Sequence, residues 1–182
     1  MATAPPLTAD DLLAMPDDGN RYELLDGEVY QLSLPSLRHQ GVSVVLAGGW
    51  LMRAQEAGHG FAFAAPVGVV FPDGSKAEPD LVFVLREHRG ILADDAIRGV
   101  PDFIVEIISP SSRRHDTALK YRIYERNGVP HYWLCDPDAE TITAHTLGAD
   151  GRYRQTAVWG RDDTLVCPLF PEITQPAAEL FG

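Results

Sequence analysis

The segment PDFIVEIISPSS, residues 101–112, places an acidic residue inside a run of apolar ones. Its β-branched and aromatic residues are typical of a strand that is covered on both faces. Glu106 interrupts this run. Because an isolated ionised carboxylate is costly to bury, we expect Glu106 to lie near the end of its strand, to be paired, or to bind a cation.

Strand and helix patterns surround this segment. We expect earlier strands in FAFAAPVGVVF (61–71) and EPDLVFVL (78–85), a later one in VPHYWLCD (129–136), and a hairpin formed by TITAHTL and YRQTAVW. RYELLDGEVYQLS (21–33) predicts another hairpin, with its turn at Asp26 and Gly27. This order indicates a mixed α/β (α+β) fold with β hairpins added at both ends.

Three helices are predicted by apolar spacing and capping residues. The first is short, begins after Thr8, and has Asp10 and Asp11 in its first turn. The second covers residues 36–58 and stops at Gly58. The third follows the Glu106 strand, is capped by Ser111 or Ser112, and ends at Gly128.

Length and composition predict a single globular domain over residues 1–182, with 45% hydrophobic and 23% charged residues. A run of about eighteen apolar residues is absent, and the N-terminus does not resemble a signal peptide. We therefore expect a cytoplasmic protein with no membrane contact. Cys135 and Cys167 have no ligand-like spacing, which predicts two reduced core thiols.

The formal net charge of −11 disfavours diffuse attraction to nucleic acid. A nucleic-acid contact would have to be local, and SRRHDTALKYRIYER is the candidate because its basic residues outnumber its acidic ones. Arg113 and Arg114 could contact phosphates there. The alternative is an ordinary solvated helix face.

Asp80 and Glu106 are candidate metal ligands. Asp80 begins one apolar run and Glu106 lies in the next, so pairing of these strands would bring the two carboxylates together. Mg²⁺ and Mn²⁺ prefer such oxygen ligands, often one or two carboxylates with waters. Alternatively, Asp80 caps a turn after Pro79 and Glu106 pairs with an arginine.

Lys120 is the candidate catalytic cation. The following helix carries it to where a long side chain could reach a phosphate or an attacking water near the strand ends. Position 108, which shares a strand face with Glu106, is isoleucine. The alternative for Lys120 is an exposed i, i+4 pair with Asp116.

Several segments together resemble the bacterial Uma-type family of restriction endonucleases, within the PD-(D/E)XK nuclease superfamily. They are RYELLDGEVY, SLRHQ, EPDLVFV, PDFIVEIISPSSRRHDTALKYRIYERNGVPHYWLCDP and PLFPEITQPAAELF, and they span nearly the whole chain. The resemblance implies a restriction-endonuclease-like central mixed sheet flanked by helices, with a metal-dependent nuclease site.

The resemblance also implies roles for single residues. Asp80 and Glu106 would be the acidic metal ligands, with the Ile107 carbonyl as a further ligand. Lys120 would replace the lysine that the superfamily usually carries at the position of Ile108. Glu28 and His39 match family positions and are auxiliary candidates.

These observations predict a Mg²⁺- or Mn²⁺-dependent endodeoxyribonuclease that hydrolyses DNA with metal-activated water. Two alternatives stay open. One is a catalytically inert relative that serves as a binding or interaction module, and the other is a hydrolase of a different phosphoester. A homodimer would suit the cutting of two strands.

Overall fold

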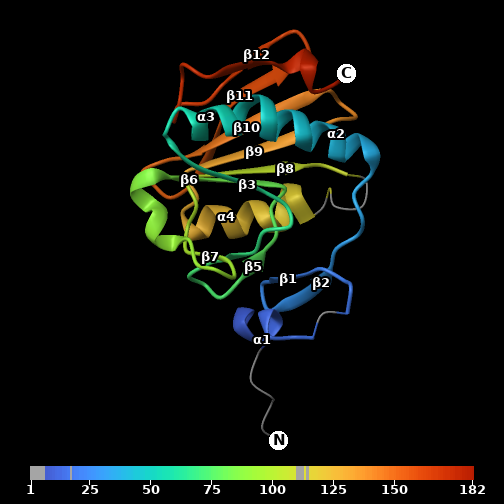
Figure 1. Ribbon diagram of the computed structural model, residues 1–182, viewed down its shortest axis with the longest axis vertical. Coiled ribbons are helices and arrows are strands. Elements are labelled where there is room, and N and C mark those ends of the chain that lie inside the picture. Colours follow the sequence, from blue (N-terminus) through green and yellow to red (C-terminus); the bar gives the residue numbers. More distant parts are fainter. Residues whose placement is uncertain (1–6, 17, 110–112, 114) are drawn as a thin grey trace, which may run out of the picture.

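The computed structural model describes residues 7–16, 18–109, 113 and 115–182 (Figure 1). Its centre is a six-stranded sheet with the strand order β11-β10-β9-β8-β6-β3. Strands β8 and β9 run parallel, and the other neighbours are antiparallel, so the central sheet is mixed as predicted. The six strands are β3 (Gly60–Ala64), β6 (Leu81–Leu85), β8 (Phe103–Ile107), β9 (His131–Asp136), β10 (Thr141–Leu147) and β11 (Tyr153–Gly160).

A second, five-stranded sheet has the order β2-β1-β5-β4-β7. Its strands are β1 (Tyr22–Leu25), β2 (Glu28–Gln31), β4 (Val69–Val70), β5 (Lys76–Ala77) and β7 (Ile97–Arg98). Asp26 and Gly27 both have positive φ angles, 53° and 80°, which suits the tight turn predicted between β1 and β2. A two-stranded sheet of β12 (Thr164–Val166) and β13 (Thr174–Pro176) lies near the C-terminus.

The expectation of one strand over residues 61–71 was wrong. Residues 60–64 form β3 of the central sheet, whereas Val69 and Val70 form β4 of the second sheet. Pro66 and Gly68 stand between them, and a proline cannot donate to a strand ladder. The connection before β8 contains the 3-10 helix η2 (Arg86–Ile91) as well as β7.

The long N-terminal helix is formed by three consecutive segments: α2 (Leu37–Leu46), the π-helix η1 (Ala47–Leu51) and α3 (Met52–Glu56). Ser36 caps its start by accepting the backbone N–H of His39. Gly58 follows its end with a φ of 89°. Gly49, in the π-helix, packs so closely on Gln175 that a Cβ there would lie 2.4 Å from that side chain.

The helix that follows β8 begins as the π-helix η3 (His115–Lys120) and continues as α4 (Tyr121–Asn127). It ends at Gly128, whose φ is 85°, as predicted. The predicted caps, Ser111 and Ser112, lie outside the described residues. The short helix α1 (Ala9–Leu13) begins after Thr8, which forms the expected cap with Asp11.

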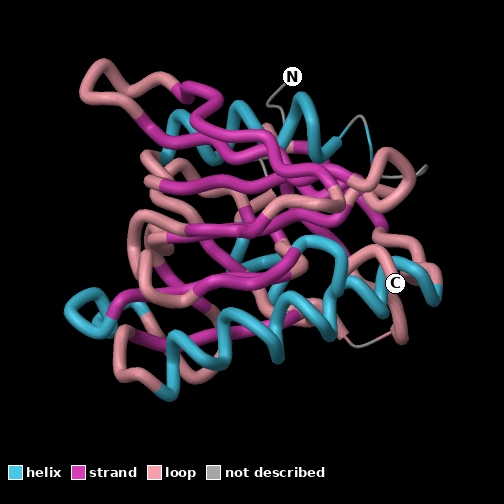
Figure 2. Tube along the Cα trace, turned by 90° about the horizontal axis from the view of Figure 1, so that it is seen from above, coloured by secondary structure: helices cyan, strands magenta, loops and turns pink. Residues whose placement is uncertain are grey.

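The inner strands of the central sheet, β6, β8 and β9, are buried on both faces. One face packs against α2, η1 and the C-terminal segment that carries the 3-10 helix η4 (Ala177–Glu179). There Trp50 stacks on Trp133 with ring centroids 4.7 Å apart, and Trp133 contacts Trp159 at 4.6 Å. The other face packs against α4 and the second sheet, and includes Tyr124 and Tyr132. Figures 1 and 2 show helices on both sides of the strands.

Two smaller predictions concern the cysteines and membrane contact. Cys135 and Cys167 are buried and free, as expected of core thiols. Within the described part of the chain, each helix is too short or too polar to cross a bilayer.

Candidate active site

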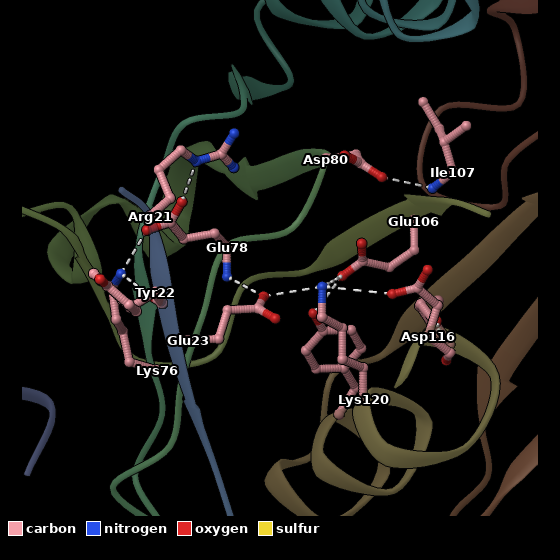
Figure 3. Close-up of polar contacts among 12 residues, drawn as sticks. Arg21, Tyr22, Glu23, Lys76, Glu78, Asp80, Glu106, Ile107, Asp116 and Lys120 are labelled. Atoms are coloured by element: carbon pink, nitrogen blue, oxygen red, sulfur yellow. Dashed lines mark hydrogen bonds and ion pairs between the residues drawn. The ribbon is translucent and has the colours of Figure 1, made fainter. Parts of the chain in front are cut away.

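Asp80 and Glu106 meet because β6 and β8 pair. The antiparallel register sets Leu81 opposite Val105, so Asp80, which precedes β6, lies beside Glu106. The Ile107 backbone N–H donates to Asp80 Oδ2 at 2.7 Å, which fixes this carboxylate against β8 (Figure 3). The predicted juxtaposition of the two acidic residues is therefore present.

Lys120 is buried at the centre of an acidic cluster. Its side chain comes from the last residue of the π-helix, and the residue is only 4% exposed. Its Nζ lies 2.9 Å from Glu23 Oε1 and 3.1 Å from Glu106 Oε1 (Figure 3). Asp116 Oδ1 is 3.6 Å away. The alternative of an exposed pair between Lys120 and Asp116 alone is thus excluded.

Glu106 accepts two bonds through the same oxygen. Lys120 donates to Oε1, and the Tyr124 hydroxyl donates to it at 2.6 Å. Glu106 is 2% exposed and points to the α4 side of the sheet, where Ile108 also packs. The charge partner of Glu106 is therefore a lysine and not the arginine of the alternative interpretation. Neither bond engages Oε2.

Glu23 belongs to the site, although it was not among the predicted residues. It is fully buried on β1, and its Oε1 accepts the Glu78 backbone N–H at 2.8 Å as well as the Lys120 ammonium group. Its Oε2 is buried without a hydrogen-bond partner among the described residues. The sequence feature that could have identified Glu23 is an acidic residue inside the short apolar strand of RYELLDGEVY, and the same kind of feature identified Glu106.

Glu28, predicted as an auxiliary residue, lies outside this cluster. It starts β2, which is the edge strand of the second sheet, and its side chain is exposed. The Tyr30 hydroxyl donates to Glu28 at 2.7 Å. The hairpin thus contributes Glu23 from its inner strand and keeps Glu28 at the surface.

His39, the other predicted auxiliary residue, lies beside Asp80 in the site. It is in the first turn of α2, is mostly buried, and its Nε2 is 3.1 Å from Asp80 Oδ2. Burial lowers the pKa of His39, but the hydrogen bond and the charge of Asp80 outweigh it, so the pKa is raised overall. His39 is therefore a second group that holds Asp80 in place.

The cluster contains more negative than positive charge. Glu23, Asp80, Glu106 and Asp116 surround the single ammonium group of Lys120. Burial raises the pKa of Glu106 well above its usual range; Lys120 opposes this, and the nearby carboxylates of Asp116, Asp80 and Glu23 add to it. Burial lowers the pKa of Lys120, but these carboxylates outweigh it and keep the lysine charged.

Five of the site residues line one cavity of about 350 Å³. Asp80, Glu106, Asp116, Lys120 and His39 contribute to its wall. The rest of the wall includes Arg21, Glu78 and the connection between β2 and α2, residues 32–36. The predicted catalytic residues are therefore accessible from a single recess.

The donor set suits a hard divalent cation held by few protein ligands. Among the described residues, no three His, Cys, Asp or Glu side chains form a ready-made metal cluster. Mg²⁺ nevertheless commonly takes one or two carboxylates and keeps several waters. Asp80 and Glu106 supply two carboxylates. Glu23 adds a third nearby, and its Oε2 is buried without a hydrogen-bond partner among the described residues.

The predicted DNA-binding arginines are only partly described. Arg113 is half-exposed and donates to Asp136 Oδ2 at 2.8 Å. Arg114 lies outside the described residues. Asp102, which precedes β8, is bonded to His88 and the Leu85 N–H and does not line the cavity.

The fold and the site together define a mixed α/β protein with an Asp–Glu–Lys cluster in one cavity. The chain belongs to the Uma2 family, described as "Putative restriction endonuclease", whose model matches residues 9–178. None of the curated proteins matches the chain. A crystal structure of a putative nuclease belonging to DUF820 from Anabaena variabilis is similar, with a TM-score of 0.79 and 20% identity. The match covers 97% of this chain and 98% of that one.

Proposed function

We propose that this protein is a metal-dependent endonuclease that hydrolyses phosphodiester bonds in DNA. The observation that carries the proposal is the convergence of Asp80, Glu106 and buried Lys120 on one cavity. Membership of a family of putative restriction endonucleases supports the same reaction class.

Asp80 and Glu106 would hold Mg²⁺ or Mn²⁺, with the Ile107 carbonyl as a further ligand. When bound, such an ion neutralises charge on the transferring phosphate and lowers the pKa of an attacking water. The Ile107 N–H and His39 hold Asp80 in orientation. The excess of carboxylates over ammonium groups supports a cation here, because a divalent ion would relieve their repulsion.

Lys120 would orient the attacking water or stabilise charge on the phosphate oxygens. Glu23 and Asp116 act on the same lysine from two sides and restrict where its ammonium group can lie. Because Ile108 packs in the core on the face shared with Glu106, Lys120 supplies from the helix the cation that a strand lysine would supply. Pairing of two copies would present two such sites to the two DNA strands.

Metal binding and cleavage test the proposal together. Calorimetric titration with Mn²⁺ should show binding to the parent protein, and both Asp80→Asn and Glu106→Gln should weaken it at least about tenfold, since each removes one charged ligand. The same variants should lose cleavage of supercoiled plasmid in Mg²⁺ and in Mn²⁺.

Asp102→Asn is the matched control, because Asp102 is a buried aspartate next to β8 but outside the cavity. It should bind Mn²⁺ and cut DNA as the parent does, with folding checked by melting temperature. Equal Mn²⁺ binding by the parent and both site variants would refute the ligand assignment. Metal binding without cleavage of any DNA would favour an inert relative, and turnover of simple phosphoesters alone would favour a different hydrolase.

A further inference from the structure

Two exposed leucines lie on or directly beside the segment, residues 32–36, that lines the cavity. Leu34 lines the cavity and is 94% exposed, and Leu37, one residue after the cap of α2, is 91% exposed. They are the two most exposed large hydrophobic residues in the described part of the chain. We call Leu34 and Leu37 the apolar lip. Their position next to the site makes them more informative than a scattered surface leucine.

Among the described residues, three arginines on segments that line or adjoin the cavity are each bonded to a carboxylate. Arg21, which lines the cavity, bonds Glu78 at 2.8 Å. Arg38, the neighbour of Leu37, bonds Asp138 at 2.9 Å, and Arg113 bonds Asp136. With a net charge of −11 on the chain, attraction of phosphates to this region is weak. A nucleic acid that binds here needs contacts that do not depend on charge.

The reactive groups themselves are recessed. Glu106 and Lys120 are almost fully buried, and the side chains of Asp80 and His39 are only 18% and 10% exposed. A scissile phosphate must enter the cavity to reach them. A strand held in a regular duplex is restrained by stacking and pairing, whereas an unpaired strand can bend into a recess and turn its bases outward.

From the apolar lip and the recessed site together, we infer that the preferred substrate is DNA with unpaired nucleotides beside the scissile phosphate, such as a flap, a bulge or a single strand. The faces of the unpaired bases pack on Leu34 and Leu37 while the backbone enters the cavity. This inference rests on the proposed function and specifies its substrate class. It also gives the acidic protein a contact with DNA that salt does not screen.

Binding without cleavage tests the inference most directly. Fluorescence anisotropy in Ca²⁺ would compare a flapped duplex, a single strand and a fully paired duplex of the same sequence. We expect the parent protein to bind the unpaired substrates about tenfold more tightly than the paired duplex, because base contacts with apolar side chains add to backbone contacts. The ratio should persist when the salt concentration is raised.

The double variant Leu34→Ala/Leu37→Ala should reduce that ratio to about one, since the lip is the contact that distinguishes the substrates. Val44→Ala is the matched control: Val44 is an exposed apolar residue on the same helix that does not line the cavity, so it should leave the ratio unchanged. Melting temperatures should be alike, because all three side chains are exposed.

Other outcomes separate this inference from the proposed function. Cleavage or binding that does not distinguish paired from unpaired DNA, or a ratio unaffected by the double variant, overturns the inference and leaves the nuclease proposal standing. Light scattering that shows a dimer dissociated by the double variant, with unchanged DNA affinity, makes the lip a subunit contact and also overturns it. A parent protein that neither binds nor cuts any of these DNAs overturns both.

Discussion

At the scale of single residues, the site depends on one cation among several carboxylates. Lys120 is buried and bonded to Glu23 and Glu106, with Asp116 nearby. Removing one member of a buried charged cluster leaves the others uncompensated in a medium that solvates them poorly. Removal of the lysine that we assign to chemistry should therefore also destabilise the metal-free protein.

Lys120→Met should cost about 3–5 kcal/mol of unfolding free energy, because it keeps the side-chain volume but leaves buried carboxylates unpaired. Urea denaturation monitored by circular dichroism measures this. Arg122→Met is the control on the same helix; Arg122 is exposed, so its replacement should change stability by less than about 0.5 kcal/mol. Equal effects of the two substitutions would contradict the buried charge cluster.

If Lys120→Met remains folded at low temperature, it should lose plasmid cleavage while keeping Mn²⁺ binding. The two effects separate the structural from the catalytic role of the lysine. An added Mn²⁺ ion should also recover part of the lost stability, because it binds the folded state and compensates the same carboxylates.

Two histidines outside the site should make the folding stability of the protein depend on pH in the mildly acidic range. Burial lowers the pKa of His131, against the attraction of Asp102. Burial also lowers the pKa of His145, against a hydrogen bond that its ring donates to the Tyr132 backbone. In the unfolded chain both would titrate near the ordinary value of about 6.5. As the pH falls through that value, the unfolded state binds protons that the folded state does not.

The contribution of these two histidines to stability should therefore decrease between pH 7.5 and pH 5.5, as the pH passes below the ordinary histidine pKa. His39, whose pKa is raised, acts in the opposite direction. Urea midpoints across this window measure the decrease. The double variant His131→Gln/His145→Gln should show a shallower dependence, because neither position then takes up a proton on unfolding. A slope equal to that of the parent would show that other groups govern the response.

At the scale of elements, strand pairing explains why the acidic pair was predictable. Asp80 and Glu106 belong to consecutive apolar runs, and adjacent antiparallel strands bring such positions together. Glu23 was not predictable in the same way, because β1 belongs to a different sheet and reaches Lys120 only through tertiary packing. Glu28 lies outside the cluster because it begins the edge strand β2 and is exposed, whereas Glu23 lies on the inner strand β1 and is buried.

In the helices, too, local sequence signals predict some features but not those that depend on tertiary packing. Their ends at Gly58 and Gly128 were predictable from glycine alone. The π-helical segments were not, because their wider turns depend on what packs against them. Lys120 ends one such segment, η3, and π-helical turns are frequent at functional sites.

Replacement of Gly41 and Gly49 by alanine, both in the long N-terminal helix, should change the stability of the protein in opposite directions. Gly41 in α2 has open space around it, so Gly41→Ala should stabilise the protein by about 0.5–1 kcal/mol through helix propensity. Gly49→Ala should destabilise it, because the new methyl group displaces the buried Gln175 and its hydrogen bond to the Val45 carbonyl. Thermal unfolding of both variants checks this, and two shifts of the same sign would contradict the packing of Gly49.

At the scale of the whole molecule, the cavity lies where the two larger sheets meet. Glu23 comes from the second sheet, Glu106 comes from the central sheet, and Asp80 lies on the chain that passes from β5 to β6. Arg21, Lys76 and Glu78 connect this passage to β1 through hydrogen bonds (Figure 3). The site is thus complete only when the N-terminal hairpin is docked.

The positions of the stacked tryptophans on the α2 side also determine which part of the protein interior tryptophan fluorescence reports on. Trp50, Trp133 and Trp159 are all the tryptophans that the chain contains, and they form one contiguous group of rings. Tyr124, Tyr132, Tyr121 and Tyr153 gather instead on the opposite side of the sheet. Tryptophan emission therefore follows one half of the interior and tyrosine absorbance the other, so the two chromophores act as separate reporters of whether both halves melt together.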